Sequence, residues 1–133
     1  MARELDIRPL ATGDAPALHA AGRASIASLS HWFPWAHPDY APSDAEARIA
    51  HCTAARARGE EFAFGVFGID GELQGCVGLN QVKRAHRSAN LGYWIGEAHR
   101  GCGIATGAAR QVAATGFREL GLVLHRLDLA PDA

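Results

Sequence analysis

The segment Gly92–Arg110, GYWIGEAHRGCGIATGAAR, places a loop with two glycines between a strand-like run and an alanine-rich run. From Ile104 to about Leu120, apolar residues recur at helical spacing. They are Ile104, Ala108, Ala109, Val112, Ala113, Phe117 and Leu120. A helix of that length between two strands permits a right-handed crossover between parallel strands. The chain is therefore expected to build a sheet with at least one parallel pair.

The other elements follow from periodicity and turn residues. We expect strands at 5–10, on both sides of Asp70-Gly71 within 61–83, at 89–95 and at 124–130. We expect helices at 12–30, from Ser43 to before Gly59, and at 104–120. The Asp-Gly pair is typical of a hairpin, and Ser43 with Glu46 is typical of a capping box. Residues 31–42, with three prolines and four aromatic residues, are expected to form a loop. The predicted class is α+β, with a mixed central sheet flanked by helices in the order β-α-α-β-β-β-α-β.

Size and composition restrict the function. The 133 residues form one domain with a net charge of −1, which does not favour a nucleic-acid or membrane-surface partner. The first ten residues contain no apolar signal-peptide core, so we expect a cytoplasmic protein. Three cysteines without a CxxC pair, and seven histidines without an HxxxH or HExxH pair, predict neither a disulfide framework nor a metal site.

The glycine loop has two interpretations. The backbone N–H groups of residues 100–105 lack helical acceptors and can converge on an anion at the positive end of a helix dipole. Gly101 and Gly103 leave room for a diphosphate, and Arg100 adds a cation. Alternatively, the loop is only a strand-to-helix turn that requires glycine. The spacing fits neither a Walker loop nor a dinucleotide GxGxxG motif.

RGCGIA, Arg100–Ala105, resembles the Gln/Arg-x-x-Gly-x-Gly/Ala signature of the GNAT N-acyltransferase superfamily. The preceding ANLGYWIGEAHRG and the aromatic loop HWFPWAHPDY resemble the branch with ribosomal-protein N-terminal acetyltransferases. The resemblance extends from Leu5 to the end of the chain. It implies a single acyl-CoA-binding domain over residues 1–133 that transfers an acetyl group directly from acetyl-CoA to a primary amine, with no metal.

The same resemblance implies the cofactor contacts. Backbone groups of Arg100, Gly101, Cys102, Gly103, Ile104 and Ala105 would hold the diphosphate, and Tyr93, Trp94 and Ile95 would pair with the pantetheine arm. A strand N–H would stabilise the tetrahedral oxyanion where this strand and the last one separate. Only one of Tyr93 and Trp94 is expected to face the cofactor side, because side chains alternate across a sheet. A covalent acyl-Cys102 is conceivable at a helix N-terminus, but the family transfers directly.

The sequence identifies the residues that would contact the acceptor amine less clearly than those that would contact the cofactor. The branch often carries Glu at the position of Asn90, and Asn cannot act as a base. Asn80 or Asn90 is therefore expected to orient the acceptor or a water. Alternatively, these side chains only form hydrogen bonds at the edge of a hairpin. Glu97 is an alternative base, or a solvated loop acid. Trp32 and Trp35, with Phe33, could form the acceptor pocket or simply fold onto the core. His86 is expected in an exposed turn.

The family continues with a helix and two more strands beyond the point where this chain ends, so the resemblance predicts a domain incomplete at its C-terminus. A fragment, a homo-oligomer whose partner supplies strands, and a degenerate CoA binder all fit. The function hypotheses are accordingly an N-acetyltransferase, or a non-catalytic acyl-CoA-binding or interaction module; a scaffold without ligand is a third.

Overall fold

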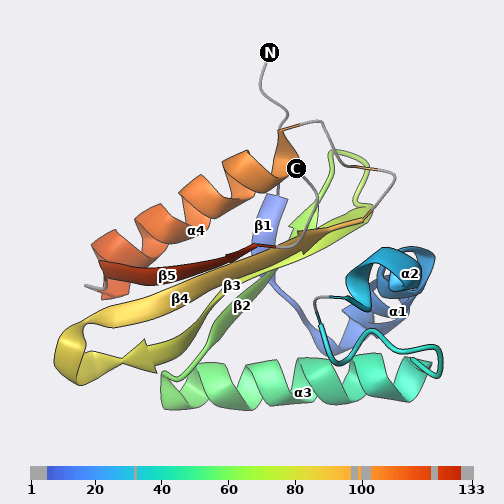
Figure 1. Ribbon diagram of the computed structural model, residues 1–133, viewed down its shortest axis with the longest axis horizontal. Coiled ribbons are helices and arrows are strands. Elements are labelled where there is room, and N and C mark those ends of the chain that lie inside the picture. Colours follow the sequence, from blue (N-terminus) through green and yellow to red (C-terminus); the bar gives the residue numbers. More distant parts are fainter. Residues whose placement is uncertain (1–5, 32, 97–98, 100–102, 121–122, 130–133) are drawn as a thin grey trace.

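The computed structural model describes residues 6–31, 33–96, 99, 103–120 and 123–129 (Figure 1). The strands are β1 (Asp6–Pro9), β2 (Phe62–Phe67), β3 (Leu73–Lys83), β4 (Ser88–Ile95) and β5 (Val123–Leu129). The helices are α1 (Ala15–Ala24), α2 (Ile26–Leu29), α3 (Pro42–Arg58) and α4 (Ile104–Leu120). Single 3-10 turns, η1 (Thr12–Asp14) and η2 (Arg84–His86), precede α1 and β4.

The strands form one mixed sheet in the order β1-β2-β3-β4-β5. Pairs β1–β2, β2–β3 and β3–β4 are antiparallel, and β4 and β5 are parallel across the α4 connection. Helices α1, α2 and α3 cover one face of the sheet and α4 covers the other (Figure 1). The predicted α+β class and the parallel crossover are confirmed. Helix α4 also begins and ends where its periodicity predicts.

Two helix boundaries differ from the prediction. The first helix is broken at Ser25, which leaves helical geometry at φ −118° and ψ 19°, so that α2 becomes a separate turn. Serine is a weaker helix former than alanine. Helix α3 begins at Pro42, which is favoured in a first helical turn, so Ser43 is not its cap. Asp44, rather than Glu46, accepts a 2.8 Å hydrogen bond from the N–H of the capping residue Ala41.

Two hydrophobic clusters lie on opposite faces of the sheet. The cluster beneath α1 and α3 contains Leu10, Ala15, Leu18, Leu29, Ala36, Tyr40, Ala45, Ile49, Phe67, Leu73 and Trp94. The cluster beneath α4 contains Phe62, Val66, Val77, Leu79, Ala89, Leu91, Ile95, Ile104, Ala108 and Val112. Trp94 belongs to the first cluster, whereas Tyr93 packs against the second. The predicted alternation of Tyr93 and Trp94 across the sheet is therefore confirmed.

Asp14 connects β1 to the start of α1. Its Oδ2 accepts hydrogen bonds from the Ala11 N–H at 2.7 Å and from Arg8 Nη1 at 3.0 Å, and its Oδ1 accepts from Arg8 Nη2 at 3.2 Å. The Arg8 guanidinium also lies 4.0 Å above the centre of the Phe67 ring. These hydrogen bonds, led by those from Arg8, lower the pKa of Asp14.

Asp14→Asn is expected to lower the free energy of unfolding by about 1 kcal/mol at pH 7, as loss of a helix-start hydrogen bond does. Because the pKa of Asp14 is lowered in the folded state, its carboxylate stabilises the fold above the ordinary aspartate pKa. That stabilisation disappears as pH falls through the lowered pKa. Urea unfolding at pH 7 and at about pH 2 checks this, with exposed Asp39→Asn as the control. An undiminished difference at the lower pH would contradict it.

Candidate acceptor pocket

The sheet face beneath α1 and α3 is hollowed at its centre because one row of residues carries almost no side chain. Strand register places Ala63 beside Gly78 and Gly78 beside Gly92, across β2, β3 and β4. The preceding row holds Gly65, Cys76 and Trp94, and the following row holds Asn80 and Asn90. Larger side chains therefore stand on both sides of a small-residue floor.

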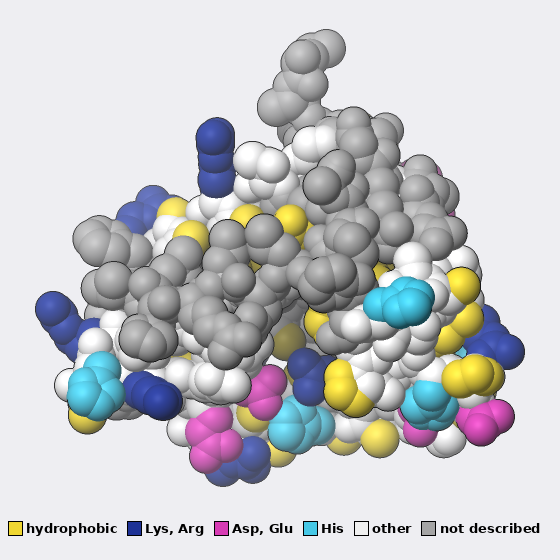
Figure 2. All heavy atoms as spheres, in the orientation of Figure 1, with side chains coloured by type: hydrophobic (Ala, Val, Ile, Leu, Met, Phe, Trp, Pro, Cys, Tyr) yellow, Lys and Arg dark blue, Asp and Glu magenta, His cyan; other side chains and the backbone are white. Residues whose placement is uncertain are grey.

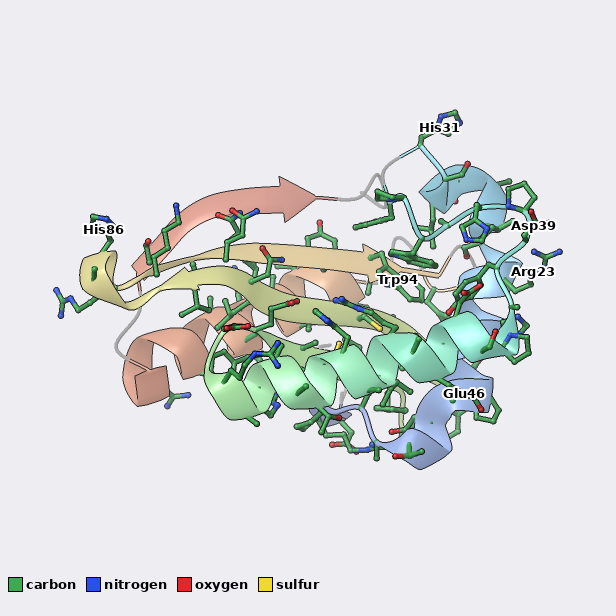
Figure 3. All side chains as sticks on the ribbon, turned by 90° about the horizontal axis from the view of Figure 1, so that it is seen from below. Arg23, His31, Asp39, Glu46, His86 and Trp94 are labelled. Carbon is green, nitrogen blue, oxygen red and sulfur yellow. The ribbon has the colours of Figure 1, made fainter. Side chains whose placement is uncertain are left out.

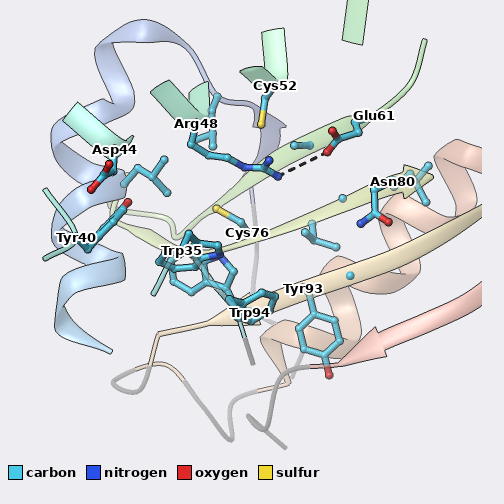
Figure 4. A pocket seen from close by; sticks show the side chains of 18 residues that line it. Trp35, Tyr40, Asp44, Arg48, Cys52, Glu61, Cys76, Asn80, Tyr93 and Trp94 are labelled. Atoms are coloured by element: carbon cyan, nitrogen blue, oxygen red, sulfur yellow. Dashed lines mark ion pairs between the residues drawn. The ribbon is translucent and has the colours of Figure 1, made fainter. Parts of the chain in front are cut away.

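A pocket of about 280 Å³ occupies this hollow (Figure 4). The described lining comes from the sheet, from α1 and α3, and from the segments that lead into these helices and into β2. It consists of Leu10, Leu18, Phe33, Trp35, Tyr40, Asp44, Arg48, Cys52, Glu61, Ala63, Cys76, Val77, Gly78, Leu79, Asn80, Gly92, Tyr93 and Trp94. The alternating burial of β3 agrees with this, since Val77 and Leu79 are buried while Cys76, Gly78 and Asn80 are only half-buried.

Aromatic rings form one end of the pocket. The Trp35 ring centre lies 5.8 Å from that of Phe33, 5.3 Å from that of Tyr40 and 5.6 Å from that of Trp94. Gly22 of α1 makes this packing possible, because a Cβ there would lie 3.0 Å from Tyr40 and 3.2 Å from Trp35. Figure 3 shows Trp94 pointing toward α1 and the loop, whereas His86 lies at the far turn between β3 and β4.

Helix α3 supplies a polar wall. Asp44, Arg48 and Cys52 follow one another at four-residue spacing and therefore lie on one helix face. Arg48 Nη2 lies 3.7 Å from Glu61 Oε1, an ion pair too long for a hydrogen bond. His51 Nε2 lies 2.7 Å from Glu61 Oε2. Glu61 precedes Phe62, whose partner on β3 is Leu79, so it stands next to Asn80 at the end of the pocket away from Tyr40 (Figure 4).

Burial in the pocket favours the neutral forms of the Tyr40 phenol and of the Cys52 and Cys76 thiols. Burial, with the nearby Cys76 and the Asp44 carboxylate, raises the pKa of Tyr40 to about 12. Burial raises the pKa of Cys76 to about 12 and also raises that of Cys52. Neither thiol has the character of an activated nucleophile, which requires a lowered pKa.

The two candidate asparagines have different surroundings. Asn80 lines the pocket, whereas Asn90 is buried outside the lining and donates a 2.9 Å hydrogen bond from Nδ2 to Gln81 Oε1. Gln81 reaches it because the register of β3 shifts after Asn80 and Gln81 adopts φ 50°. The structure therefore brings Asn80 to the pocket and gives Asn90 a hydrogen-bonding role within the hairpin.

The remaining residues predicted to contact the acceptor also differ in where they lie. Trp35 and Phe33 line the pocket, and their rings pack into the same cluster as the core, so both interpretations of the aromatic loop apply to them. Trp32 and Glu97 lie outside the described residues. His86 ends the exposed turn η2, as its sequence position predicts.

The expected cofactor loop is described only at its end. Arg100, Gly101 and Cys102 lie outside the described residues, as does the side chain of Ala105. Gly103 has φ 76°, and its carbonyl accepts a hydrogen bond from the Gly107 N–H at 3.1 Å. Backbone conformation alone thus favours glycine there, while a Cβ would have no atom within 4 Å and would project into open space. Both interpretations of the glycine remain compatible with this geometry.

Helix α4 starts beside the end of β4, on the face of the sheet opposite the pocket. Ile104 and Ile95 belong to the same core cluster. The register between β4 and β5 runs from Ser88↔Val123 to Tyr93↔Leu129. Strand β4 therefore borders the pocket through Gly92, Tyr93 and Trp94 and the start of α4 through Ile95.

Sequence reasoning did not single out Asp44, Arg48, Glu61, Cys76 or Gly78. The four-residue spacing on α3 and the two-residue spacing on β3 were available signals. These two signals could not be combined into a site without knowing that α3 lies over β2 and β3. The described part of the chain contains no helix long and apolar enough to cross a bilayer, and none of its His, Cys, Asp and Glu side chains form a group of three or more suited to a metal ion.

Comparison with known proteins identifies the family. The family described as "Acetyltransferase (GNAT) domain" matches residues 4–131. The chain is 40% identical over 83 residues, 61% of its length, to "Probable N-acetyltransferase YjcK" of Bacillus subtilis, and 40% identical over 53 residues, 40% of its length, to "Putative ribosomal N-acetyltransferase YdaF" of the same organism. A crystal structure named "Probable acetyltransferase" superimposes with a TM-score of 0.83 at 27% identity, covering 92% of this chain and 68% of its own.

The aligned parts span 45% and 29% of the two Bacillus subtilis proteins. The family match, in contrast, covers nearly the whole chain and agrees with the mixed sheet and the crossover helix. This chain belongs to the GNAT acetyltransferase family.

Proposed function

We propose that this domain transfers an acetyl group from acetyl-CoA directly to a primary amine bound in the pocket. The observation that carries the proposal is the position of β4, which borders the pocket on one face and the start of α4 on the other. Two reactants that approach β4 from opposite faces would meet at the strand. Holding amine and thioester together would supply a large part of the rate.

Acetyl-CoA would bind at the α4 side. The first N–H groups of α4 lack helical acceptors and favour an anion such as a diphosphate. The resemblance assigns Arg100–Ala105 to this anion and the backbone of Tyr93, Trp94 and Ile95 to the pantetheine arm. The open space next to Gly103 supports room for a phosphate group. A β4 N–H would stabilise the oxyanion of the tetrahedral intermediate.

Glu61 is our candidate for the group that removes the amine proton. An ammonium must lose a proton before its nitrogen can attack, and the described pocket lining offers two carboxylates, Asp44 and Glu61. Glu61 adjoins Asn80, and its Oε2 is bonded to half-exposed His51, which connects it to solvent. The proton would pass to Glu61, directly or through a water held by Asn80. The neutral amine would then attack the thioester carbon and the C–S bond would break. The nitrogen would lose its second proton as the amide forms, and the departing CoA thiolate would take it up to leave as the free thiol.

Tyr40 is a poor candidate for protonating that thiolate. Its pKa of about 12 lies above the ordinary pKa of a thiol, so the transfer would be uphill. We therefore assign Tyr40 to the pocket wall.

Calorimetric titration with acetyl-CoA, followed by a thiol-release assay with a panel of amines, tests the proposal. We expect saturable binding and CoA release that depends on the amine. Binding without release for any amine would favour a non-catalytic acyl-CoA-binding module. Absence of binding would contradict the proposal altogether.

A further inference from the structure

Charge in the pocket restricts which amines it suits. Its described lining carries two carboxylates, of Asp44 and Glu61, and one guanidinium, of Arg48. Glu61 is already next to two partners, Arg48 and His51. A polyamine would bring several ammonium groups into this space, and each buried ammonium requires a partner. The described lining therefore matches an acceptor with a single positive charge.

The opposite end of the pocket is built for an apolar group. Figure 4 shows Trp35, Tyr40 and Trp94 together at this end, and the pocket lining also includes Leu10, Leu18 and Phe33. The three rings nearest Trp35 have centres between 5.3 and 5.8 Å from its own, which is the range of favourable aromatic packing. The hydroxyl of Tyr40 is uncharged at neutral pH, as a tyrosine ordinarily is, and burial raises its pKa further, to about 12. An apolar side chain would thus meet mainly uncharged rings there, with the Asp44 carboxylate beside Tyr40 as the one charged group of the described lining at this end.

The two ends set the orientation of the acceptor. Its nitrogen must reach the thioester, which the proposed function places at β4, above the small-residue floor of Ala63, Gly78 and Gly92. The rest of the acceptor then extends toward Trp35 and Tyr40, which Figure 4 shows at the end opposite Glu61 and Asn80. A volume of about 280 Å³ accommodates an aromatic side chain with the amine that it carries.

The geometry points to an acceptor of one chemical class: a primary amine with a single positive charge, one or two carbons from a large apolar or aromatic group. This inference rests on the proposed function. A peptide N-terminus that begins with a large apolar residue and a free arylalkylamine both present this chemistry. Spermidine and a peptide that begins with glycine do not.

The test uses the unaltered protein with saturating acetyl-CoA and four acceptors. These are Phe-Gly-Gly amide, Gly-Gly-Gly amide, 2-phenylethylamine and spermidine. We expect kcat/KM for the Phe peptide to exceed that for the Gly peptide by about 10- to 100-fold, the value of burying one aromatic side chain. The ratio of the Phe peptide to 2-phenylethylamine distinguishes a peptide source from a free amine. Equal rates for the two peptides, or spermidine as the best acceptor, would overturn the inference while leaving acetyl transfer established.

A second measurement does not depend on turnover. Trp35 and Trp94 line the pocket, so an aromatic acceptor is expected to change tryptophan fluorescence saturably in the protein–CoA complex. If no amine is acetylated although the Phe peptide binds and the Gly peptide does not, the proposed function fails and the acceptor class stands. If neither peptide binds and neither is acetylated, both fail.

Trp35→Leu tests whether this preference arises at the aromatic end of the pocket. Trp35 is half-buried there, with its ring centre 5.3 to 5.8 Å from those of three other rings, so leucine removes the centre of the aromatic wall and leaves an apolar side chain in its place. The Phe-over-Gly preference is expected to fall about tenfold, while affinity for acetyl-CoA serves as the internal check on folding. An unchanged preference with unchanged acetyl-CoA affinity would place the apolar group elsewhere and overturn the inference.

Discussion

Gly103→Val is expected to weaken acetyl-CoA binding by about 100-fold, equivalent to losing about two charge-assisted hydrogen bonds to phosphate. Two effects act together. A β-branched residue is disfavoured at φ 76°, so the first turn of α4 must move. Its side chain would also fill the space beside the helix N-terminus where a Cβ now has no neighbour within 4 Å. Calorimetric titration of the variant with acetyl-CoA measures the loss.

A matched variant separates these effects from a general loss of stability. Gly59 ends α3 at φ 72°, close to the φ of 76° at Gly103, and the end of α3 lies far from the start of α4 (Figure 1). Gly59→Val should cost a similar amount, about 1–2 kcal/mol of folding free energy, with unchanged acetyl-CoA affinity. Thermal unfolding of both variants verifies the comparison. Equal losses of affinity, or none for Gly103→Val, would show that the loop glycine serves only the turn.

Local rules predict most of the elements in this fold. The α4 boundaries follow from the spacing of Ile104, Ala108 and Val112, all of which are buried. The Asp70-Gly71 pair correctly predicts the hairpin between β2 and β3, and Gly59 correctly predicts the end of α3. These signals act over a few residues, so no knowledge of the tertiary structure is required. The same rules do not predict boundaries at which several weak signals compete, such as the break at Ser25.

The pocket was only partly predictable, because it arises from contacts between distant segments. Trp35 and Asn80 were identified as acceptor candidates from the aromatic loop and the strand pattern. Asp44, Arg48 and Glu61 became visible only once α3 was placed over β2 and β3. Asn80 and Asn90 are equivalent in the sequence pattern, and the register shift after Asn80 separates them by bringing Gln81 to Asn90.

The charged side chains of the described residues on the face shown in Figure 2 give no comparable indication of function. Along α3, acidic, basic and histidine side chains are intermingled rather than gathered into a patch of one sign (Figure 2). This agrees with a net charge of −1. Surface charge of this kind provides little long-range steering of a charged partner. Specificity is therefore expected to come from the pocket.

Glu61→Gln is expected to lower kcat by about 10²- to 10⁴-fold at pH 7, the usual contribution of a positioned general base. Glutamine retains the size of the side chain and cannot take a proton. Asp44→Asn is the matched control, because it removes the other described carboxylate of the same pocket, and we expect less than about a tenfold effect from it. Loss of the half-exposed pairs with Arg48 and His51 costs Glu61→Gln little stability, and the amide oxygen of Asp44→Asn can still accept the capping hydrogen bond from the Ala41 N–H, so both variants should fold.

The pH dependence of that defect distinguishes a base from a residue that only binds the acceptor. As pH rises toward the pKa of the acceptor amine, more of the amine is already neutral and needs no base. The ratio of wild-type to Glu61→Gln kcat/KM should therefore shrink from pH 7 to about pH 9.5, whereas a binding defect would raise KM at all pH values. Steady-state thiol release across this range measures both. A defect independent of pH, or a larger loss in Asp44→Asn, would assign the proton transfer to another group and leave Glu61 as part of the pocket wall.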